Sequence, residues 1–177
     1  VTDDSALTAR TLTIPVTLGQ LLRRRADLSD ISLADAEVAL LINERGEANW
    51  DFPGHTANTP MRVRLDQASF RYFDARNSQS MTLGNVDGVL DLRADGGAAF
   101  AGTAVINSRL VKIDADVKSL ARINEDGSPL ELALATDGGS ANFSGQLSTA
   151  KVLSLAGPVS LASATPAAAL QFIGLPL

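Results

Sequence analysis

The sequence predicts a mainly β protein, built as a curved, mostly antiparallel and repeating β-sheet that carries two or three short helices. Three observations support this fold class. Apolar and polar residues alternate with period two along most of the chain, which is the pattern of strands with one buried face. Turn residues such as Asp-Gly separate the alternating segments. Aromatic residues make up only 5% of the 177 residues, so Leu, Val, Ile and Ala must build the core.

Length and composition narrow the class of protein. With 45% apolar residues the chain can bury a core, and we expect a single β-rich domain over residues 1–177. The formal net charge of -5 disfavours nucleic acid as a partner, because phosphate binding needs a basic face. The absence of cysteine removes disulfides and thiolate chemistry. Because the chain starts at Val1 and lacks the roughly 20 consecutive apolar residues of a membrane helix, we expect a fragment of a longer protein.

The N-terminal part predicts a strand, a short helix and a second strand. Residues 8–16 alternate and end with apolar residues on one side. The apolar spacing then becomes helical over residues 18–25, with Thr17 as the N-cap. In Ala36–Asn43 the even-numbered residues are apolar up to position 42, which predicts the strand around which the rest of the sheet is organised.

A polar turn follows this second strand. Gly46 can take the positive φ that such a turn requires, and the chain returns through residues 48–52, so a hairpin is predicted. Asn49 is expected to bond the turn backbone. Trp50, the only tryptophan, is expected to be a buried structural residue at the end of the sheet.

The middle of the chain predicts further strands and two similar hairpins. Residues 61–73 alternate but shift phase by one position, which predicts either one strand bent at a β-bulge or two strands. Residues 81–92 predict another strand. Asp-Gly-Gly turns begin at Asp95 and at Asp137, 42 positions apart (137 − 95). This spacing suggests a repeating β architecture, although two ordinary hairpins would look the same.

The alternation is clearest between these two turns. Val111, Ile113 and Val117 alternate with charged residues, so the sheet should have one dry face and one wet face. A helical turn is predicted at residues 119–123 and a short helix at residues 166–173, with Pro at its first position.

The sequence offers no constellation of catalytic residues. His55, the only histidine, lies in a predicted loop and has no nucleophile motif beside it. Asp114 and Asp116 share a strand face at a separation near that used by inverting glycosidases. Lys112 and Lys118 bracket them, however, which predicts a solvated ion-pair row. Metal-ligand spacing is absent as well, so we predict no enzyme, no cofactor and no metal.

The segment Gly46–Trp50, with the pattern G-x-x-N-W after an apolar strand, resembles a turn of the AsmA family of bacterial envelope proteins. Upstream, Leu12–Val16 and Leu18–Leu22 are similar to the family in order and spacing. Downstream, Ala68–Asp74 looks like the family's strand that ends in an aromatic residue and an aspartate. The resemblance marks as structural, family-like positions Gly46, Asn49, Trp50, Tyr72 and Asp74.

The resemblance also implies a function and a location. AsmA-like and TamB-related proteins are similar to bridge-like lipid-transfer proteins, whose curved sheets form a hydrophobic trough. The implied protein is a periplasmic segment, anchored to the inner membrane of a Gram-negative bacterium by a missing N-terminal helix. It would bind and conduct phospholipid acyl chains in outer-membrane lipid homeostasis and biogenesis. The residues expected to face lipid are Val38, Leu40, Ile42, Val111, Ile113 and Val117.

Two other functions stay open at this point. A scaffold could aid outer-membrane protein assembly through contacts at its strand edges. A periplasmic hydrolase is disfavoured because no catalytic constellation is present. The alternation itself fits both an open groove and a closed core, since either would place apolar residues on one face of the sheet.

Overall fold

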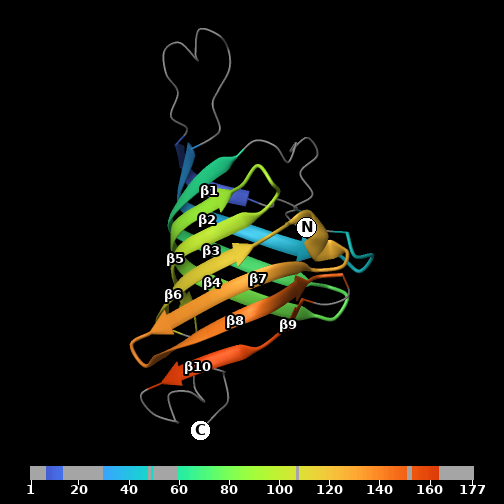
Figure 1. The fold of residues 1–177 in the computed structure, drawn as a ribbon. Coiled ribbons are helices and arrows are strands. Elements are labelled where there is room, and N and C mark those ends of the chain that lie inside the picture. Colours follow the sequence, from blue (N-terminus) through green and yellow to red (C-terminus); the bar gives the residue numbers. More distant parts are fainter. Residues whose placement is uncertain are drawn as a thin grey trace.

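The computed structural model describes residues 7–13, 30–47, 49, 60–106, 108–150 and 153–163. In these residues ten strands form a single sheet (Figure 1). The strands are β1 (Leu7–Thr13), β2 (Asp30–Ile42), β3 (Met61–Asp74), β4 (Gln79–Leu92), β5 (Ala98–Ile106), β6 (Arg109–Val117), β7 (Ser128–Thr136), β8 (Gly139–Ser148), β9 (Ser154–Ala156) and β10 (Val159–Ser163), with one 3-10 helix, η1 (Ala121–Asn124), between β6 and β7.

The strands follow one another through the sheet in nearly sequential order. The order is β1-β2-β3-β4-β5-β6-β7-β8-β10, and β9 also pairs with β8. All pairs are antiparallel except β2 with β3. The mainly β, mostly antiparallel fold is therefore confirmed, and η1 lies close to the helical turn predicted at residues 119–123. The helices predicted at residues 18–25 and 166–173 lie outside the described residues, as does His55.

The turn after β2 was expected to lead into a segment, residues 48–52, that returns beside β2 as a hairpin. Of these residues the structure describes only Asn49, whose N donates to Leu41 O of β2 at 3.0 Å, so the chain lies beside β2 at this residue. The sheet neighbours of β2 are β1 and β3, and β3 runs parallel to it. The turn itself is present, with Asn43 N donating to Glu47 O at 3.0 Å and with Gly46 at φ 82°, as predicted.

Three neighbouring strands bend at residues with positive φ. These residues are Asp35 in β2, Gln67 in β3 and Asn85 in β4. The pairing of β3 with β4 shifts register at this level, and Gln67 N donates to the carboxylate of Asp87 at 2.8 Å. A β-bulge adds one residue to a strand and increases its bend. The phase shift read from residues 61–73 is thus a bulge within the single bent strand β3.

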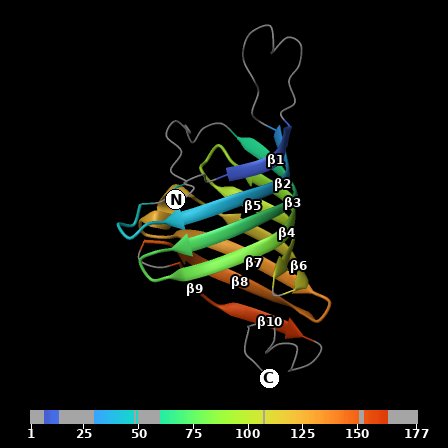
Figure 2. The same cartoon turned by 180° about the vertical axis from the view of Figure 1, so that it is seen from behind.

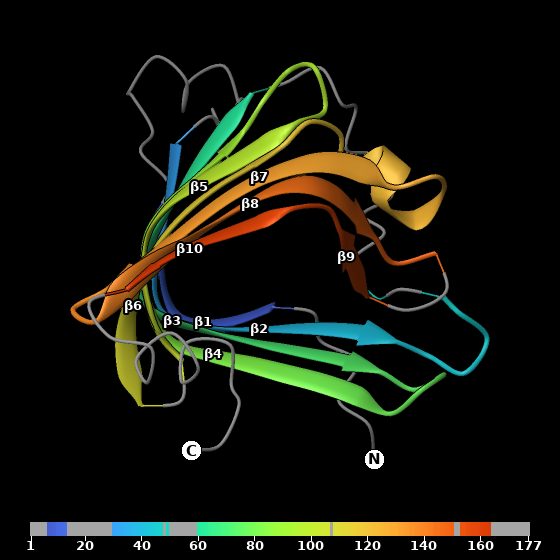
Figure 3. The same cartoon turned by 60° about the horizontal axis from the view of Figure 1, so that its bottom comes forward.

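Because of these bulges the sheet curls until two of its parts face each other (Figures 2 and 3). One part, called here the β2–β4 side, consists of residues 37–42, 69–74 and 79–83. The other part, the β5–β10 side, contains strands β5 to β8 and β10. Figure 3 shows the bend at one end of this curve and the loops after β2, β3 and β8 at the opposite, open end. We call the face that lines the curve the inner face.

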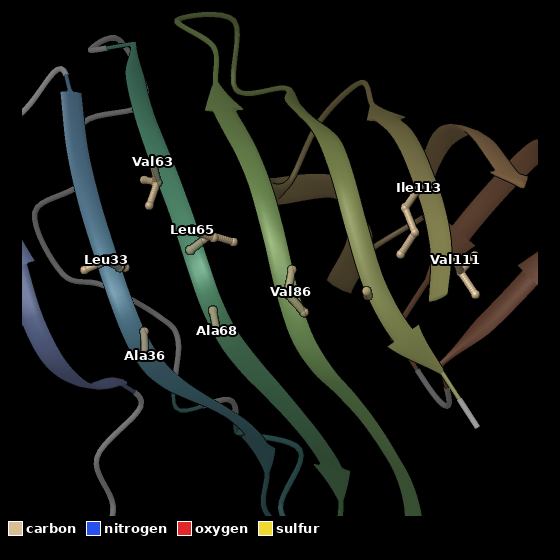
Figure 4. Packing of buried hydrophobic residues seen from close by; sticks show 9 residues of the cluster. Leu33, Ala36, Val63, Leu65, Ala68, Val86, Val111 and Ile113 are labelled. Atoms are coloured by element: carbon tan, nitrogen blue, oxygen red, sulfur yellow. The ribbon is translucent and has the colours of Figure 1, made fainter. Parts of the chain in front are cut away.

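Small residues line the bend on the inner face. Ala36, Ala68 and Val86 follow the three bulges directly and are 2%, 0% and 3% exposed, and Ala104 in β5 is 0% exposed. They belong to one buried apolar cluster, and Figure 4 labels its members Leu33, Ala36, Val63, Leu65, Ala68, Val86, Val111 and Ile113. The inner side of a sharp bend is crowded, so alanine fits where a larger side chain would force the strands apart.

Two phenylalanines cover glycines on the inner face. A Cβ added to Gly102 would meet the ring of Phe100 at 2.8 Å, and one added to Gly88 on the neighbouring β4 would meet the same ring at 3.0 Å. Phe143 covers Gly145 in β8 in the same manner, with 2.6 Å to such a Cβ. A ring folded over a strand glycine replaces the packing that the glycine lacks. This Phe-x-Gly arrangement is the part of the apparent repeat that both copies share.

The hairpins at Asp95 and Asp137 join β4 to β5 and β7 to β8. The strands between the two turns are β5, β6 and β7, an odd number. Antiparallel strands alternate in direction, so the two turns lie at opposite ends of the strands. The two turns also differ in length, since the first spans residues 93–97 with Gly96 at φ 81° and the second spans only residues 137–138. The 42-residue spacing therefore does not mark units that could be superposed by a simple shift along the sheet.

Gly102→Ala should destabilise the protein by about 1–3 kcal/mol, the usual cost of overpacking. The added methyl group would overlap the carbonyl oxygen of Asp87, and it would displace the ring of Phe100. Gly84→Ala is the matched control, because a Cβ there meets no atom within 4 Å. Urea unfolding of both variants checks this; equal stability of the two variants would contradict it.

Candidate functional site: the inner face of the curved sheet

The inner face carries two adjacent rows of residues, and each row crosses eight strands. Within a row, each residue lies directly opposite the next one on the neighbouring strand. Neither row contains a polar side chain, and at about 4.8 Å per strand each row extends roughly 34 Å. The first row is Ile31, Val63, Leu90, Phe100, Ala115, Leu132, Phe143 and Val159, and the second is Leu33, Leu65, Gly88, Gly102, Ile113, Leu134, Ala141 and Leu161.

The outer face of the same strands is charged. Arg62 Nε lies 2.6 Å from Asp91 Oδ1, and this bond lowers the pKa of Asp91. Arg93 and Lys118 both contact the carboxylate of Asp116, at 2.7 and 3.0 Å. The Arg62–Asp91 pair is largely exposed and so adds little stability, whereas the Arg93–Asp116 pair is partly buried. These charged side chains keep the outer face hydrated, whereas the inner face is apolar.

Part of the inner face remains open to solvent. Among the described residues, four inner-face apolar side chains are exposed: Met81 (47%), Leu155 (52%), Val159 (57%) and Leu161 (44%). Met81 lies on β4, and the other three lie on β9 and β10 at the edge of the sheet. Apolar exposure is not confined to this face, since Phe73 and Leu110 point outward. The inner face thus combines a buried centre at the bend with accessible apolar margins.

All six residues expected to face lipid lie on the inner face. Ile42, Val111 and Ile113 are buried, whereas Val38, Leu40 and Val117 are half-buried. The prediction did not include inner-face residues of the C-terminal strands, although the alternation within residues 130–136 and 141–147 could have indicated them. Such residues include Leu132, Leu134, Ala141 and Phe143. Val159 and Leu161 of β10 were omitted as well, and they lie outside those two ranges.

Asn49 acts differently from the prediction. It does not bond the turn; its Oδ1 accepts from Leu41 N at 2.8 Å and its Nδ2 donates to Ala39 O at 2.9 Å, both in β2. The turn backbone is bonded by Asn43, whose Oδ1 accepts from the N–H groups of Arg45 and Glu47. Asn49 therefore holds the returning chain to β2. Its neighbour Trp50 lies outside the described residues.

Tyr72 and Asp74 form a polar cluster at the end of β3. The Asp74 side chain is fully buried, and Arg76 binds it through Nε to Oδ1 at 2.9 Å and through Nη2 to Oδ2 at 2.7 Å. Hydrogen bonds from Arg76 lower the pKa of Asp74, while burial raises the pKa of Tyr72. Asp74 is thus ionised and paired with Arg76 at neutral pH.

The two outer-face aspartates are unsuited to acid–base chemistry. A catalytic general acid needs a raised pKa, but hydrogen bonds from Arg93 and Lys118 lower the pKa of Asp116. Asp114 is exposed. Within the described ranges no group of three His, Asp or Glu side chains could hold a metal ion. A shallow pocket of about 360 Å³ lies at the bulges, mainly beneath the outer-face residues Ser32, Arg64 and Asp66.

Comparison with protein-family models, with curated proteins and with solved structures finds no match. The resemblance to the AsmA family thus stays a prediction that rests on the motif residues. In the part of the chain that the structure describes, no helix has the length and apolarity needed to cross a membrane.

Proposed function

We propose that the protein binds the acyl chains of phospholipids along the inner face of its sheet and conducts them without bond chemistry. The observation that carries this proposal is the pair of apolar rows, which cross eight strands and end on β10 in side chains that are about half exposed. Large apolar surfaces left open to water usually mark an interaction site.

The chemistry of the inner face favours an acyl chain over a polar ligand. A polar ligand needs hydrogen-bond partners when it leaves water, and the two rows offer none. An acyl chain needs only apolar contact, worth about 25 cal/mol per Å² of buried surface. A row of roughly 34 Å also exceeds the length of one extended acyl chain, so the face could hold several chains or pass one along.

The resemblance to AsmA-like proteins places this activity in a cellular context. It favours a periplasmic segment of a protein anchored to the inner membrane, with a role in outer-membrane lipid homeostasis. The bound molecule would then be a phospholipid, and no cofactor would take part. This context rests on Gly46, Asn49, Tyr72 and Asp74, together with Trp50.

A second candidate function is a scaffold that recruits a protein strand. Within the described residues β10 pairs on one side only, with β8. The strand Val159–Ser163 contains no charged residue and no proline, the residues that usually protect an edge strand. An extended segment of an outer-membrane protein could add there. Extraction of the purified protein followed by lipid mass spectrometry distinguishes the two functions, since only the first requires a co-purifying phospholipid.

Met81→Glu should abolish crosslinking to a photoactivatable phosphatidylcholine while leaving the fold intact. Met81 lies on the inner face opposite Tyr72 and is 47% exposed, so a carboxylate there stays hydrated but repels an acyl chain. Thr82→Glu is the matched control, because Thr82 is the next residue of β4, is exposed and faces outward opposite Arg71. Crosslinking that is equal in both variants would overturn the proposal.

A further inference from the structure

Two strand ends that are distant in the sheet are joined by Arg76. β3 and β8 are separated by β4, β5, β6 and β7 in the strand order. Even so, Arg76, in the turn after β3, donates to Thr149 O at 3.1 Å and to Ala150 O at 3.2 Å, just after β8. These contacts span the open end of the curve, opposite the bend (Figure 3). They link the β2–β4 side directly to the β5–β10 side.

Both partners of this link are themselves held in place. On the β2–β4 side, the fully buried Asp74 binds the guanidinium of Arg76 through both of its oxygens, and Ala75 N donates to Ile42 O at 2.9 Å. On the other side, Thr149 N donates to Ile123 O of η1 at 2.9 Å. The planar guanidinium suits this geometry, because its five donors can serve a carboxylate and two carbonyls together.

Little else among the described bonds closes this end. The backbone ladders join only strands that are adjacent in the sheet order. The bonds from Arg76 to Thr149 and Ala150 involve a cationic donor, and their carbonyl acceptors belong to a loop rather than to a ladder. Such a link can break and reform without disturbing any strand pair.

We propose that Arg76, oriented by Asp74, is a latch across the open end of the curved sheet, and that its release separates the two sides and admits an acyl chain to the inner face. The proposal rests on the lipid-binding function proposed above. Next to the Asp74–Gln79 pair at the latch, the following inner-face residues along β3 and β4 are Tyr72 and Met81, which lie opposite each other. Opening at the latch would therefore widen the inner face where Met81 is already accessible.

The test measures the opening and the lipid transfer separately. The chain has no cysteine, so spin labels can be placed at Ser80→Cys and Gln146→Cys, two exposed outer-face positions on the two sides. Arg76→Lys keeps a cation beside Asp74, but its single ammonium nitrogen replaces the three guanidinium nitrogens that now bind the carboxylate and the two carbonyls. Asp74→Asn combined with Arg76→Gln provides a second, uncharged release variant. Arg71→Lys, on the outer face of β3, is the matched control.

Pulsed electron resonance should give a narrow distance distribution for the parent and for Arg71→Lys. Both release variants should give a longer, broader one, and they should take up labelled phosphatidylcholine from phosphatidylcholine vesicles several-fold faster. An unchanged distance in both release variants overturns the latch, and so does a longer distance with unchanged uptake. If neither the parent nor any variant takes up lipid, the proposed lipid-binding function is wrong, and the role of Arg76 in lipid entry is overturned with it. The measured distances then still show whether Arg76 holds the two sides together.

Discussion

Ile113→Glu is expected to unfold the protein or to destabilise it by about 4 kcal/mol or more, since an unpaired buried charge costs several kcal/mol. Ile113 is 9% exposed and belongs to the buried cluster near the bend, beside Val111 and Ala104. Its strand neighbours on the inner face are Gly102 and Leu134, which offer no partner for a carboxylate. Urea unfolding followed by circular dichroism measures the loss.

Lys112→Glu provides the comparison for this prediction. Lys112 precedes Ile113 in β6 but is exposed on the outer face, so the same new charge stays hydrated there. A surface substitution of this kind changes stability by about 0.5 kcal/mol or less. If Ile113→Glu were as stable as Lys112→Glu, the inner face would be open to water even at the bend, and the buried cluster would not be a core.

The difference in exposure between Ile113 and Leu40 adds to what the alternation alone could predict. Alternation shows which residues share a face of a strand, and on that basis Leu40 and Ile113 were both expected to face lipid. The curl of the sheet makes them different, because Ile113 is 9% exposed near the bend and Leu40 is half-buried on the β2–β4 side. The inner face is thus a core near the bend, and it becomes accessible at Met81 on β4 and on the edge strands β9 and β10.

The bend was only partly predictable. The shift of phase within residues 61–73 indicated the bulge at Gln67, because an added residue moves the apolar positions by one. The same shift occurs in β2, where Leu33 is followed by Ala36 on the inner face. It was missed because the strand was expected to begin at Ala36 rather than at Asp30.

Contacts between distant parts of the chain were beyond the sequence patterns. The parallel pairing of β2 with β3 could not be foreseen from the residues that separate them, since hairpin signals describe only local antiparallel pairs. The approach of Arg76 to Thr149 spans 73 positions and depends on the summed curvature of six strands. Asp74 could be singled out by resemblance, but its partner could not.

Asp74→Ala is expected to destabilise the protein by about 3 kcal/mol, because it removes one partner of a buried charged pair. The carboxylate is fully buried and accepts hydrogen bonds from Arg76 N, Nε and Nη2 and from Tyr72 Oη. Asp126→Ala is the control, since Asp126 is exposed and its nearest cation, Arg122, lies 4.0 Å away. Similar unfolding midpoints for the two variants would show that Asp74 contributes no more than a surface carboxylate.

The same carboxylate should make stability depend on pH in the acid range. Hydrogen bonds from Arg76 lower the pKa of Asp74 in the folded protein, whereas an aspartate in the unfolded chain has a pKa of about 3.9. The unfolded state therefore binds a proton first as the pH falls. The stabilisation from Asp74 is fully present above the unfolded pKa and is lost as the pH falls through the folded pKa. Asp74→Asn should be less stable than the parent at pH 7, and the difference should shrink below about pH 4. A difference that stays constant from pH 7 to pH 3 would show that the loss in Asp74→Asn comes from packing and not from the ionised pair with Arg76.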